Sequence, residues 1–314
     1  MKISSQDSIS CTPELRETIS NIVRRAVTEC VFQVRAASPA AIEPLELFHS
    51  TEAVAIKEEI VRVGRKLWDR QYVDGNGGNI SYRISSQYVL CTPTLCSKGD
   101  LRVEDISLVD LNNNLIVGSR PQTSEIKLHF SIYKSVPKAK AVVHCHPPYA
   151  TAHAVAGVVP PLNLIPEQEV FVGPVALSPY ETPGTQVFAD TILPYAKKHN
   201  TILLGNHGIV CRADTVTHAE WYTEVVDTYC KTVMIARQLK SNLPEIPADK
   251  IQDLLELKKT LGLPDARLPE EDDLTGAIET AAASVAKALP HVHPNDVDSL
   301  VSSITDEVLS LFAR

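Results

Sequence analysis

Apolar residues recur along the chain with two different spacings, and the changes between them divide it into three regions. In residues 1–44, one apolar helical face runs from Leu15 to Cys30. Over residues 45–243, short apolar runs typical of strands alternate with stretches of helical spacing, the pattern of an α/β domain. Helical spacing returns over residues 244–314. The pattern predicts a central domain with a helical extension at each end.

The central region predicts one long helix followed by strands. The helix is expected over residues 51–70, where apolar residues keep a helical spacing. No repeat of fixed period is evident. Strands are expected near residues 79–84, 88–92, 106–110, 141–146, 170–176 and 201–211.

The last segment of the chain has a clear amphipathic pattern. Pro294, Asn295 and Asp296 form an N-terminal helix signal, and an apolar stripe runs from Val297 to Phe312. Such a stripe must be covered. The cover is either the protein's own core or a sister subunit, or else a groove on a partner onto which the exposed helix docks.

Composition and charge exclude several classes of protein. The 314 residues include 30 Lys and Arg and 38 Asp and Glu, which gives a formal net charge of −8, and the sequence contains no long basic block. This charge balance disfavours nucleic acid or an anionic membrane as the main partner. No apolar run approaches the ~18 residues of a membrane span, and residues 1–12 lack the apolar core of a signal peptide. The seven cysteines form no C-x-x-C pair. We therefore expect a cytoplasmic protein with reduced thiols.

Three histidines follow apolar runs and form a candidate metal site. His144 and His146 are spaced i, i+2, so on a strand both rings point to one face and can reach one ion. His207 follows another apolar run and lies in Gly-Asn-His-Gly. Three histidines at strand ends suit a catalytic zinc with one open position, although a hydrogen-bonded structural pair is an alternative for the first two. A further H-x-H, His291 and His293, lies between prolines and is expected to be solvated.

Two other clusters could bind an anion. Thr123-Ser124-Glu125 precedes a stretch of helical spacing, so it is expected at a helix start, where free N–H groups and the dipole favour negative charge. A plain helix cap is the alternative. The glycine-rich segment 75–81 matches no Walker or dinucleotide fingerprint. It is either a tight turn into a strand or a backbone cradle that, with Asn79, holds a phosphate or ketose oxygen.

Taken in order, the motifs G-G-N-I-S, T-P-T, T-S-E, H-C-H-P-P and G-N-H-G resemble those of the class II aldolase/adducin family over about residues 53–239. The resemblance implies a three-layer α/β/α sandwich around a mostly antiparallel central sheet, to which this chain adds helices at both termini. It also implies a homotetramer with active sites between subunits. One Zn²⁺ per subunit would be held by His144, His146 and His207.

The residue that closes the T-S-E triplet separates subgroups of the family. Enzymes similar to L-fuculose-1-phosphate aldolase have glutamate there, and pentulose-phosphate 4-epimerases have aspartate. Glu125 therefore favours a zinc-dependent aldehyde-lyase in which it transfers a proton. The expected reaction cleaves a ketose 1-phosphate of the L-fuculose or L-rhamnulose type to dihydroxyacetone phosphate and an aldehyde. A 3-oxo-tetronate 4-phosphate decarboxylase or a pentulose-phosphate 4-epimerase is the alternative. The expected phosphate-binding residues are Asn79, Thr94, Thr123 and Ser124.

The sequence departs from the family pattern at two places. In the aldolases the stretch after T-P-T usually supplies a glycine to the phosphate site, whereas here T-P-T is followed by Leu-Cys-Ser-Lys-Gly. Nearby Lys98 either supplies charge to the phosphate or is a solvated loop lysine. The tyrosine that acts as proton donor in the aldolases has no match over residues 164–170, where Glu167 is a candidate replacement.

The terminal helices suggest a further hypothesis. Amphipathic helices joined by linkers to an aldolase resemble the encapsulation peptides of enzymes packed into bacterial microcompartments. An aldolase that releases a reactive aldehyde is a sensible cargo for such a compartment, with a shell protein as the partner. A role in stabilising the oligomer is the alternative.

Overall fold

The computed structural model describes residues 43–268 and a few residues near the chain ends, namely Arg16, Glu17, Ser20, Asn21, Val23, Arg24, Val301, Ser302, Thr305 and Asp306. Contacts divide the chain into two units, Met1–Ile42 with Pro269–Arg314, and Glu43–Leu268. In the first unit, Arg16 forms an ion pair with Asp306 at 2.6 Å, and Val23 and Val301 are buried. Segments from the two chain ends therefore contact each other. The rest of the helices predicted at the ends lies outside the described residues.

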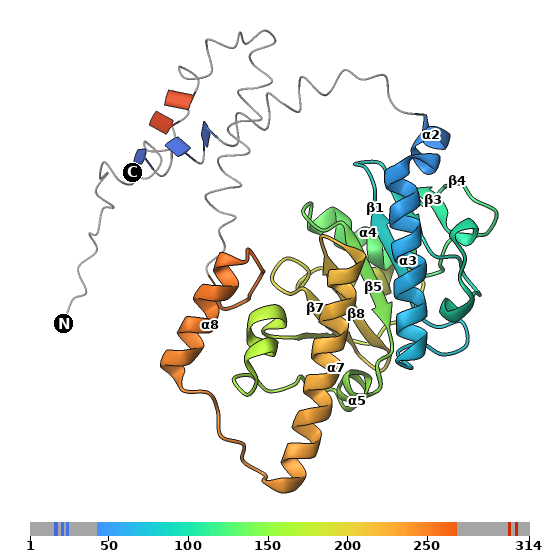
Figure 1. Ribbon diagram of the computed structural model, residues 1–314. Coiled ribbons are helices and arrows are strands. Elements are labelled where there is room, and N and C mark those ends of the chain that lie inside the picture. Colours follow the sequence, from blue (N-terminus) through green and yellow to red (C-terminus); the bar gives the residue numbers. More distant parts are fainter. Residues whose placement is uncertain are drawn as a thin grey trace. The chain divides into compact units, whose positions relative to one another are not determined.

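An eight-stranded sheet forms the centre of the unit Glu43–Leu268, with the strand order β4-β3-β2-β1-β5-β8-β7-β6 (Figure 1). Neighbouring strands are antiparallel except for β6 and β7, which are parallel. The prediction of a mostly antiparallel central sheet is confirmed. The strands are β1 (Asn79–Arg83), β2 (Tyr88–Cys91), β3 (Ser107–Asp110), β4 (Leu115–Val117), β5 (Ala141–Cys145), β6 (Ala176–Ser178), β7 (Thr201–Leu204) and β8 (Gly208–Ala213).

Helices cover both faces of this sheet. Short 3₁₀ helices span Lys98–Asp100 and Val103–Asp105, and a π-helix spans Gln168–Val172. None of the described helices is long and apolar enough to cross a membrane. The α-helices are α2 (Pro44–His49), α3 (Thr51–Asp69), α4 (Ile126–Ser135), α5 (Pro148–Ala156), α6 (Gln186–Asp190), α7 (Val216–Leu239) and α8 (Ala248–Thr260).

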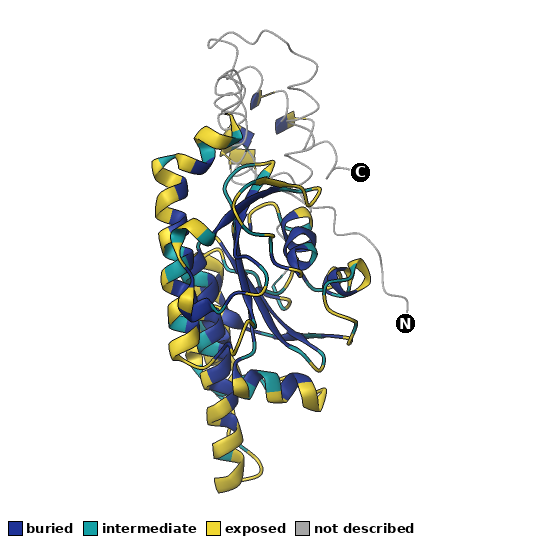
Figure 2. Ribbon diagram, turned by 90° about the vertical axis from the view of Figure 1, so that its right-hand side faces the viewer, coloured by how far each residue is buried: buried dark blue, intermediate teal, exposed yellow. Residues whose placement is uncertain are grey.

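Two apolar cores lie on opposite faces of the sheet. One contains side chains of α3, α5 and α7, and the other contains side chains of α4 and α6. Successive strand residues point to opposite faces, so Val143 of β5 joins the first core and Val142 joins the second. Figure 2 shows the buried strands edge-on, with helices on either side. The predicted three-layer α/β/α sandwich is confirmed.

The helix α3 shows why the predicted 51–70 segment is helical. Ser50 caps its start, because its hydroxyl accepts a hydrogen bond from the backbone N–H of Ala53 at 3.1 Å. The buried side chains recur every three or four residues, as one helical face requires. They are Ala53, Ile56, Ile60, Val63 and Leu67.

Two strand predictions were wrong. Residues 168–172 form a π-helix, and Gly173, whose φ is 73°, separates it from β6, so the predicted strand 170–176 does not form. The predicted strand 201–211 is a hairpin of β7 and β8, with Asn206 in the left-handed conformation at φ 54°. The edge strand β4 was not predicted, because it has only three residues and is mostly exposed, which leaves no alternating pattern.

A buried ion cluster holds α8 and the residues after it against the π-helix. Lys258 Nζ lies 3.1 Å from Asp265 Oδ2, and both side chains are fully buried. Arg267 joins Asp265, at 2.8 Å, to Glu169, at 2.6 Å. A Cβ atom at Gly173 would collide with Asp265 and Lys258, so this close approach requires glycine. The contacts thus place α8 in the same unit as the sheet, whereas the sequence predicted 244–314 as a separate extension.

We expect Asp265→Ala to lower the free energy of unfolding by about 3–5 kcal/mol, because it leaves the ammonium group of Lys258 buried without its partner. Urea unfolding followed by circular dichroism measures the change. The matched control is Asp253→Ala, which removes an exposed ion pair with Lys250 and should have little effect. Equal stability of the two variants would contradict the prediction.

Candidate metal centre

The three predicted histidines come together where β5 ends. His144 is a residue of β5, and His146 follows the end of that strand at Cys145. His207 lies in the turn between β7 and β8, and β8 pairs with β5, with Val210 opposite His144. One potential ligand atom from each histidine lies within 4.8 Å of those of the other two. Among the described residues, this is the only group of three or more His, Cys, Asp or Glu side chains that could hold a metal ion.

The ring nitrogens of these histidines are arranged as metal ligands need to be. Nδ1 of His144 donates a hydrogen bond to the carbonyl of Ile209 at 2.8 Å, so Nε2 of the neutral ring carries a free lone pair. The Nε2 atoms of His144 and His146 are 3.2 Å apart. Two ligands of a tetrahedral zinc, each at about 2.0–2.1 Å, would be separated by about 3.3 Å. Nδ1 of His207 is buried and has no hydrogen-bond partner in the described part of the chain. The donor set fits a first-row metal ion.

The electrostatics of the cluster favour neutral imidazoles, the form that binds metal. Burial is the main cause that lowers the pKa of His144, and the neighbouring rings of His146 and His207 lower it further. Burial also lowers the pKa of His146 and of His207. The three rings are therefore ready to accept a cation without first losing a proton at neutral pH.

A carboxylate completes the cluster. Glu125 directly precedes α4 and is mostly buried, and its side chain makes no capping hydrogen bond. It faces the histidines instead: Oε2 lies 3.3 Å from Nε2 of His144, and Oε1 lies 3.6 Å from Nε2 of His207. The amide nitrogen of Asn79 donates a hydrogen bond to Oε2 at 2.7 Å. Asn79 reaches this position because the register of β1 and β5 sets it opposite His144.

The T-P-T and T-S-E motifs, whose first residues are 31 positions apart in sequence, run side by side. An isolated antiparallel bridge joins Pro93 to Gln122. Next to this bridge, the N–H of Thr94 donates to the carbonyl of Pro121 at 3.1 Å, and Thr123 donates likewise to Thr92 at 3.0 Å. Three of the predicted phosphate ligands, Thr94, Thr123 and Ser124, thus lie on adjacent segments.

Asn79, the fourth predicted phosphate ligand, lies next to Glu125 of the T-S-E motif, but its side chain is otherwise engaged. Its side chain is buried, its amide nitrogen donates to Glu125, and its amide oxygen lies 2.5 Å from a ring nitrogen of His129. Both ends of the amide therefore have partners in this structure. The Asn79 side chain could reach a phosphate only by giving up one of them.

Lys98 is buried, so the alternative of a solvated loop lysine was wrong. Its ammonium group donates to the carbonyls of Cys96, at 2.6 Å, and Asn76, at 3.3 Å. Burial lowers the pKa of Lys98 to about 8, and the nearby negative charge of Glu125 acts in the opposite direction. A positive charge therefore lies between the glycine-rich turn and the histidine cluster.

Leu95, the residue after T-P-T, has a left-handed backbone conformation, which glycine adopts more readily. Its φ is 51°, in the left-handed region, and its side chain is 74% exposed. A non-glycine residue in that conformation costs about 1–2 kcal/mol. The chain thus forms this turn at the expense of backbone strain at Leu95.

Glu167 and His129 lie in opposite surroundings, one exposed and the other buried. Glu167, the candidate replacement for the missing tyrosine, is exposed and precedes the π-helix, and none of the described contacts joins it to the histidine cluster. His129, in contrast, was given no role, yet it is fully buried and contacts Asn79. Its position four residues after Glu125 was the available signal, because such residues share one helical face.

The buried ring of His129 makes the fold sensitive to acid. Burial lowers the pKa of His129 to about 3, so the unfolded chain binds a proton there below about pH 6.5 whereas the folded chain does not. The contribution of the neutral, buried His129 ring to the free energy of unfolding is therefore fully present above pH 6.5. It is lost as the pH falls toward 3.

We expect the metal-free protein to lose about 1.4 kcal/mol of unfolding free energy between pH 8 and pH 5.5 through His129 alone. In urea titrations of metal-free protein, His129→Gln should reduce the difference in unfolding free energy between pH 8 and pH 5.5 by that amount. His218→Gln, at an exposed position, is the control. If both variants keep the wild-type pH dependence, the prediction is wrong.

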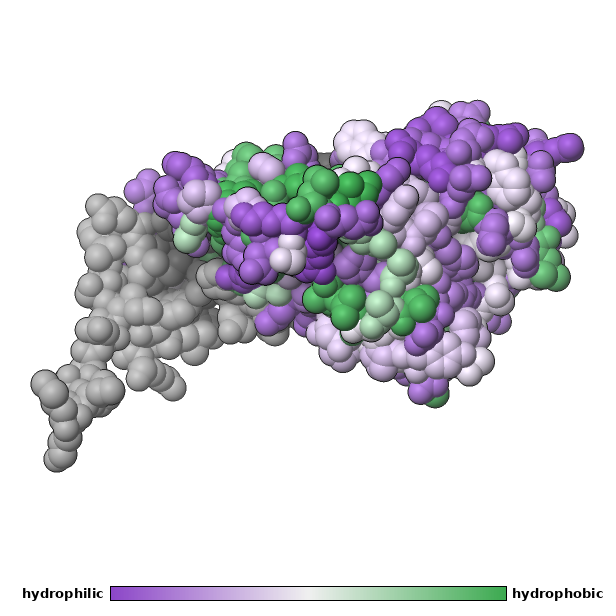
Figure 3. Space-filling model, turned by 90° about the horizontal axis from the view of Figure 1, so that it is seen from below, coloured by the Kyte–Doolittle hydropathy of each residue, from purple (hydrophilic) through white to green (hydrophobic). Residues whose placement is uncertain are grey.

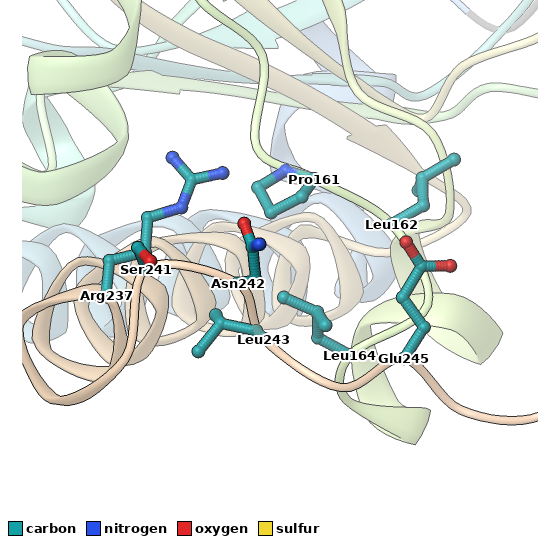
Figure 4. Close-up of a pocket in the computed structure, with 8 residues that line it drawn as sticks. All are labelled: Pro161, Leu162, Leu164, Arg237, Ser241, Asn242, Leu243 and Glu245. Atoms are coloured by element: carbon teal, nitrogen blue, oxygen red, sulfur yellow. The ribbon is translucent and has the colours of Figure 1, made fainter.

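A separate pocket of about 330 Å³ lies where the end of α7 meets the loop that follows α5. Its lining is mixed, with aliphatic side chains beside Arg237 and Glu245 (Figure 4). None of the predicted site residues lines it. The histidine cluster carries the convergent polar groups that chemistry needs, so it is the better candidate site.

Comparison with known proteins agrees with this geometry. The class II Aldolase and Adducin N-terminal domain family matches residues 58–234. The L-fuculose phosphate aldolase of Methanococcus maripaludis strain S2 is 37% identical over 183 residues, which cover 58% of this chain and 98% of that protein. The 3-oxo-tetronate 4-phosphate decarboxylase of Haemophilus influenzae is 35% identical over 182 residues, which cover 57% and 86%.

A solved structure of an L-fuculose 1-phosphate aldolase has the same fold. It is 26% identical, covers 67% of this chain and 97% of its own, and superposes with a TM-score of 0.61. The matched segment contains the sheet, the three histidines and Glu125. The chain therefore belongs to the class II aldolase and adducin N-terminal domain family.

Proposed function

We propose that the protein is a zinc-dependent lyase that cleaves a ketose 1-phosphate, of the L-fuculose or L-rhamnulose type, to dihydroxyacetone phosphate and an aldehyde. The observation that carries the proposal is the carboxylate of Glu125 within 3.3–3.6 Å of two of the three clustered histidines. His144, His146 and His207 would hold one Zn²⁺ per subunit. Zinc at this position would supply Lewis-acid stabilisation of the negative charge that develops on the substrate oxygens.

Glu125 would be the proton-transfer group. It is mostly buried and faces the histidines, as a group acting on a substrate bound there should. Its Oε1 has no hydrogen bond among the described residues and is therefore free to carry a proton. In the direction of aldol synthesis, Oε1 would take the proton from a carbon of dihydroxyacetone phosphate; in cleavage it would return that proton to the same carbon.

The substrate phosphate would bind near the T-P-T and T-S-E motifs. The adjacent segments 92–94 and 121–123 bring Thr94, Thr123 and Ser124 together, and Ser124 is exposed. The start of α4 contributes the positive end of a helix dipole. The buried charge of Lys98 adds to the positive potential in this region. Local recognition of this kind suits a chain with a net charge of −8.

A decarboxylase acting on 3-oxo-tetronate 4-phosphate is the second candidate, because the relative from Haemophilus influenzae with that name is about as similar as the aldolases. Loss of carbon dioxide from a 3-oxo acid also leaves a carbanion next to a carbonyl, and Glu125 could deliver the proton to it. The same residues therefore support both reactions. An epimerase is less favoured, since the epimerase subgroup has aspartate at this position.

The oligomer and the location of the protein remain predictions. Exposed apolar side chains could serve subunit contacts in a homotetramer, and Figure 3 shows hydrophobic patches among hydrophilic ones on one side of the molecule. The exposed apolar side chains include Val155, Val158 and Val159, each about half exposed. The proposed association with a microcompartment shell depends on the terminal helices, which lie mostly outside the described residues.

Product identification tests the proposed reaction. Purified, zinc-loaded protein is incubated separately with L-fuculose 1-phosphate, L-rhamnulose 1-phosphate, L-ribulose 5-phosphate and 3-oxo-tetronate 4-phosphate. Dihydroxyacetone phosphate from either of the first two supports the aldolase. Carbon dioxide from the last compound alone would replace the aldolase with the decarboxylase, and a stereoisomer of the pentulose phosphate would indicate the epimerase. Metal-loaded protein that converts none of the four would overturn the proposal.

A further inference from the structure

A chain of buried side chains runs from Glu125 into the core between β1 and α4. Asn79 donates to Glu125 Oε2 at 2.7 Å, and its amide oxygen is 2.5 Å from Nε2 of His129. On the other side of that ring, Nδ1 is 2.6 Å from the hydroxyl of Ser81. The same hydroxyl is 2.7 Å from the hydroxyl of Tyr133. The last four side chains are at most 3% exposed, so water does not complete their hydrogen bonding.

The hydrogen bonds that link Glu125 to Tyr133 have one direction when Glu125 is ionised. The carboxylate only accepts, so the Asn79 NH₂ group faces it and the Asn79 oxygen faces His129. That oxygen also only accepts, so Nε2 of His129 must carry the hydrogen. A fully buried His129 is neutral, because burial lowers its pKa to about 3. Nδ1 therefore accepts a hydrogen bond from Ser81.

The reversed arrangement requires a different state of the site. If the Asn79 amide turned by 180°, its oxygen would face Oε2 of Glu125 at a distance that only a protonated carboxyl group allows. Nε2 of His129 would then have to be an acceptor. The tautomer of His129, the orientation of Asn79 and the proton on Glu125 Oε2 are thus linked through hydrogen bonds.

This linkage has a consequence for the two oxygens of Glu125. Oε2 already accepts the hydrogen bond from the Asn79 amide with one lone pair, and it also lies 3.3 Å from Nε2 of His144, a proposed metal ligand. Oε1 has no such donor and lies 3.6 Å from His207. The chain of hydrogen bonds therefore leaves Oε1 as the oxygen that can gain and lose a proton without rearrangement.

We propose that His129 is a positioning residue for the reaction: its Nε2–H fixes the orientation of the Asn79 amide, which holds Glu125 Oε2 as an acceptor and reserves Oε1 for proton transfer. The inference rests on the proposed function of Glu125 as the proton-transfer group. It requires only that Glu125 exchanges a proton with substrate carbon, as both the aldolase and the decarboxylase do.

Two substitutions separate positioning from simple packing. The side-chain nitrogen of His129→Gln reaches the place of Nε2 and can still donate to Asn79, but the bond to Ser81 is lost. The shorter side chain of His129→Asn reaches the place of Nδ1 and can keep the contact with Ser81, but it leaves the Asn79 oxygen without a donor. Both variants make one hydrogen bond fewer in the same buried position, so a purely structural role predicts similar effects.

The test compares wild type and both variants in kcat and KM with the substrate that wild type converts. It also follows exchange of a carbon-bound hydrogen of dihydroxyacetone phosphate in D₂O by NMR, a reaction that needs proton transfer but no aldehyde. We expect His129→Asn to lose about 10- to 100-fold in kcat and in exchange rate with little change in KM, and His129→Gln to recover most of this loss. Zinc content should equal that of wild type in both variants.

Three outcomes decide the matter. Equal losses in the two variants, or a greater loss in His129→Gln, would overturn the positioning role. Loss of zinc in His129→Asn alone would also overturn it, because the residue would then act on the metal ligands. Absence of both cleavage and exchange in wild type would refute the proposed aldolase; the same variants would then be compared in the decarboxylation, where equal losses would again overturn the inference.

Discussion

Glu125→Gln is expected to lower kcat by about 10²- to 10⁴-fold while the protein keeps its metal. Glutamine has the shape of glutamate and can still accept the hydrogen bond from Asn79, but it cannot take up a proton at neutral pH. The proposed metal ligands are histidine nitrogens, so metal binding should not depend on this carboxylate. Steady-state kinetics and zinc analysis by mass spectrometry measure the two quantities on the same sample.

Glu104→Gln is the matched control for this substitution, because Glu104 is an exposed glutamate in a 3₁₀ helix. It should leave both kcat and zinc content unchanged. If Glu125→Gln turns over at the wild-type rate, Glu125 has no part in proton transfer, and the argument for His129 fails with it. If zinc is lost together with activity, Glu125 acts mainly on the metal.

His146→Ala is expected to lose metal and activity together. The substitution removes one of the three clustered histidine side chains. A zinc ion left with two protein ligands should bind more than about 100-fold more weakly. Zinc content after dialysis against a weak chelator and kcat without added metal should both fall close to zero.

His218→Ala provides the control for this experiment, since His218 is partly exposed on α7 and pairs with Asp214. It should retain zinc and activity. Full zinc stoichiometry in His146→Ala would remove His146 from the set of ligands. Loss of activity with zinc retained would assign His146 to substrate binding instead.

Much of the fold could be predicted because its elements have local signals. The helix α3 has a cap at Ser50 and an apolar residue at every third or fourth position. The strand β5 begins with the apolar run Ala-Val-Val, as expected for a strand buried on both faces. Such patterns depend only on neighbours along the chain, so they can be recognised without knowing what packs against them.

Both wrong strand predictions arose because the local spacing of apolar residues does not distinguish a single strand from other structures. An apolar run such as 170–172 satisfies the spacing of a buried strand and of a short helix equally well. In the structure, α8 packs against this segment, which forms a π-helix. The contacts that hold α8 there involve Lys258 and Asp265, about 90 residues further along the sequence. In 201–211, the reversal of the chain depends on a left-handed residue at Asn206 within an otherwise apolar stretch.

By itself, the sequence determined most of the helices and strands and the residues able to bind a metal, because periodicity and motif spacing are local properties. Only the tertiary structure decided which groups meet. The register of β1 against β5 sets Asn79 opposite His144, and the start of α4 brings Glu125 to both, across 46 residues of sequence. Burial then determined what these groups can do. Lys98 and His129 are ordinary polar residues in the sequence, but burial lowers the pKa of both. Lys98 thereby carries a charge that is removed from water, and the ring of His129 stays neutral.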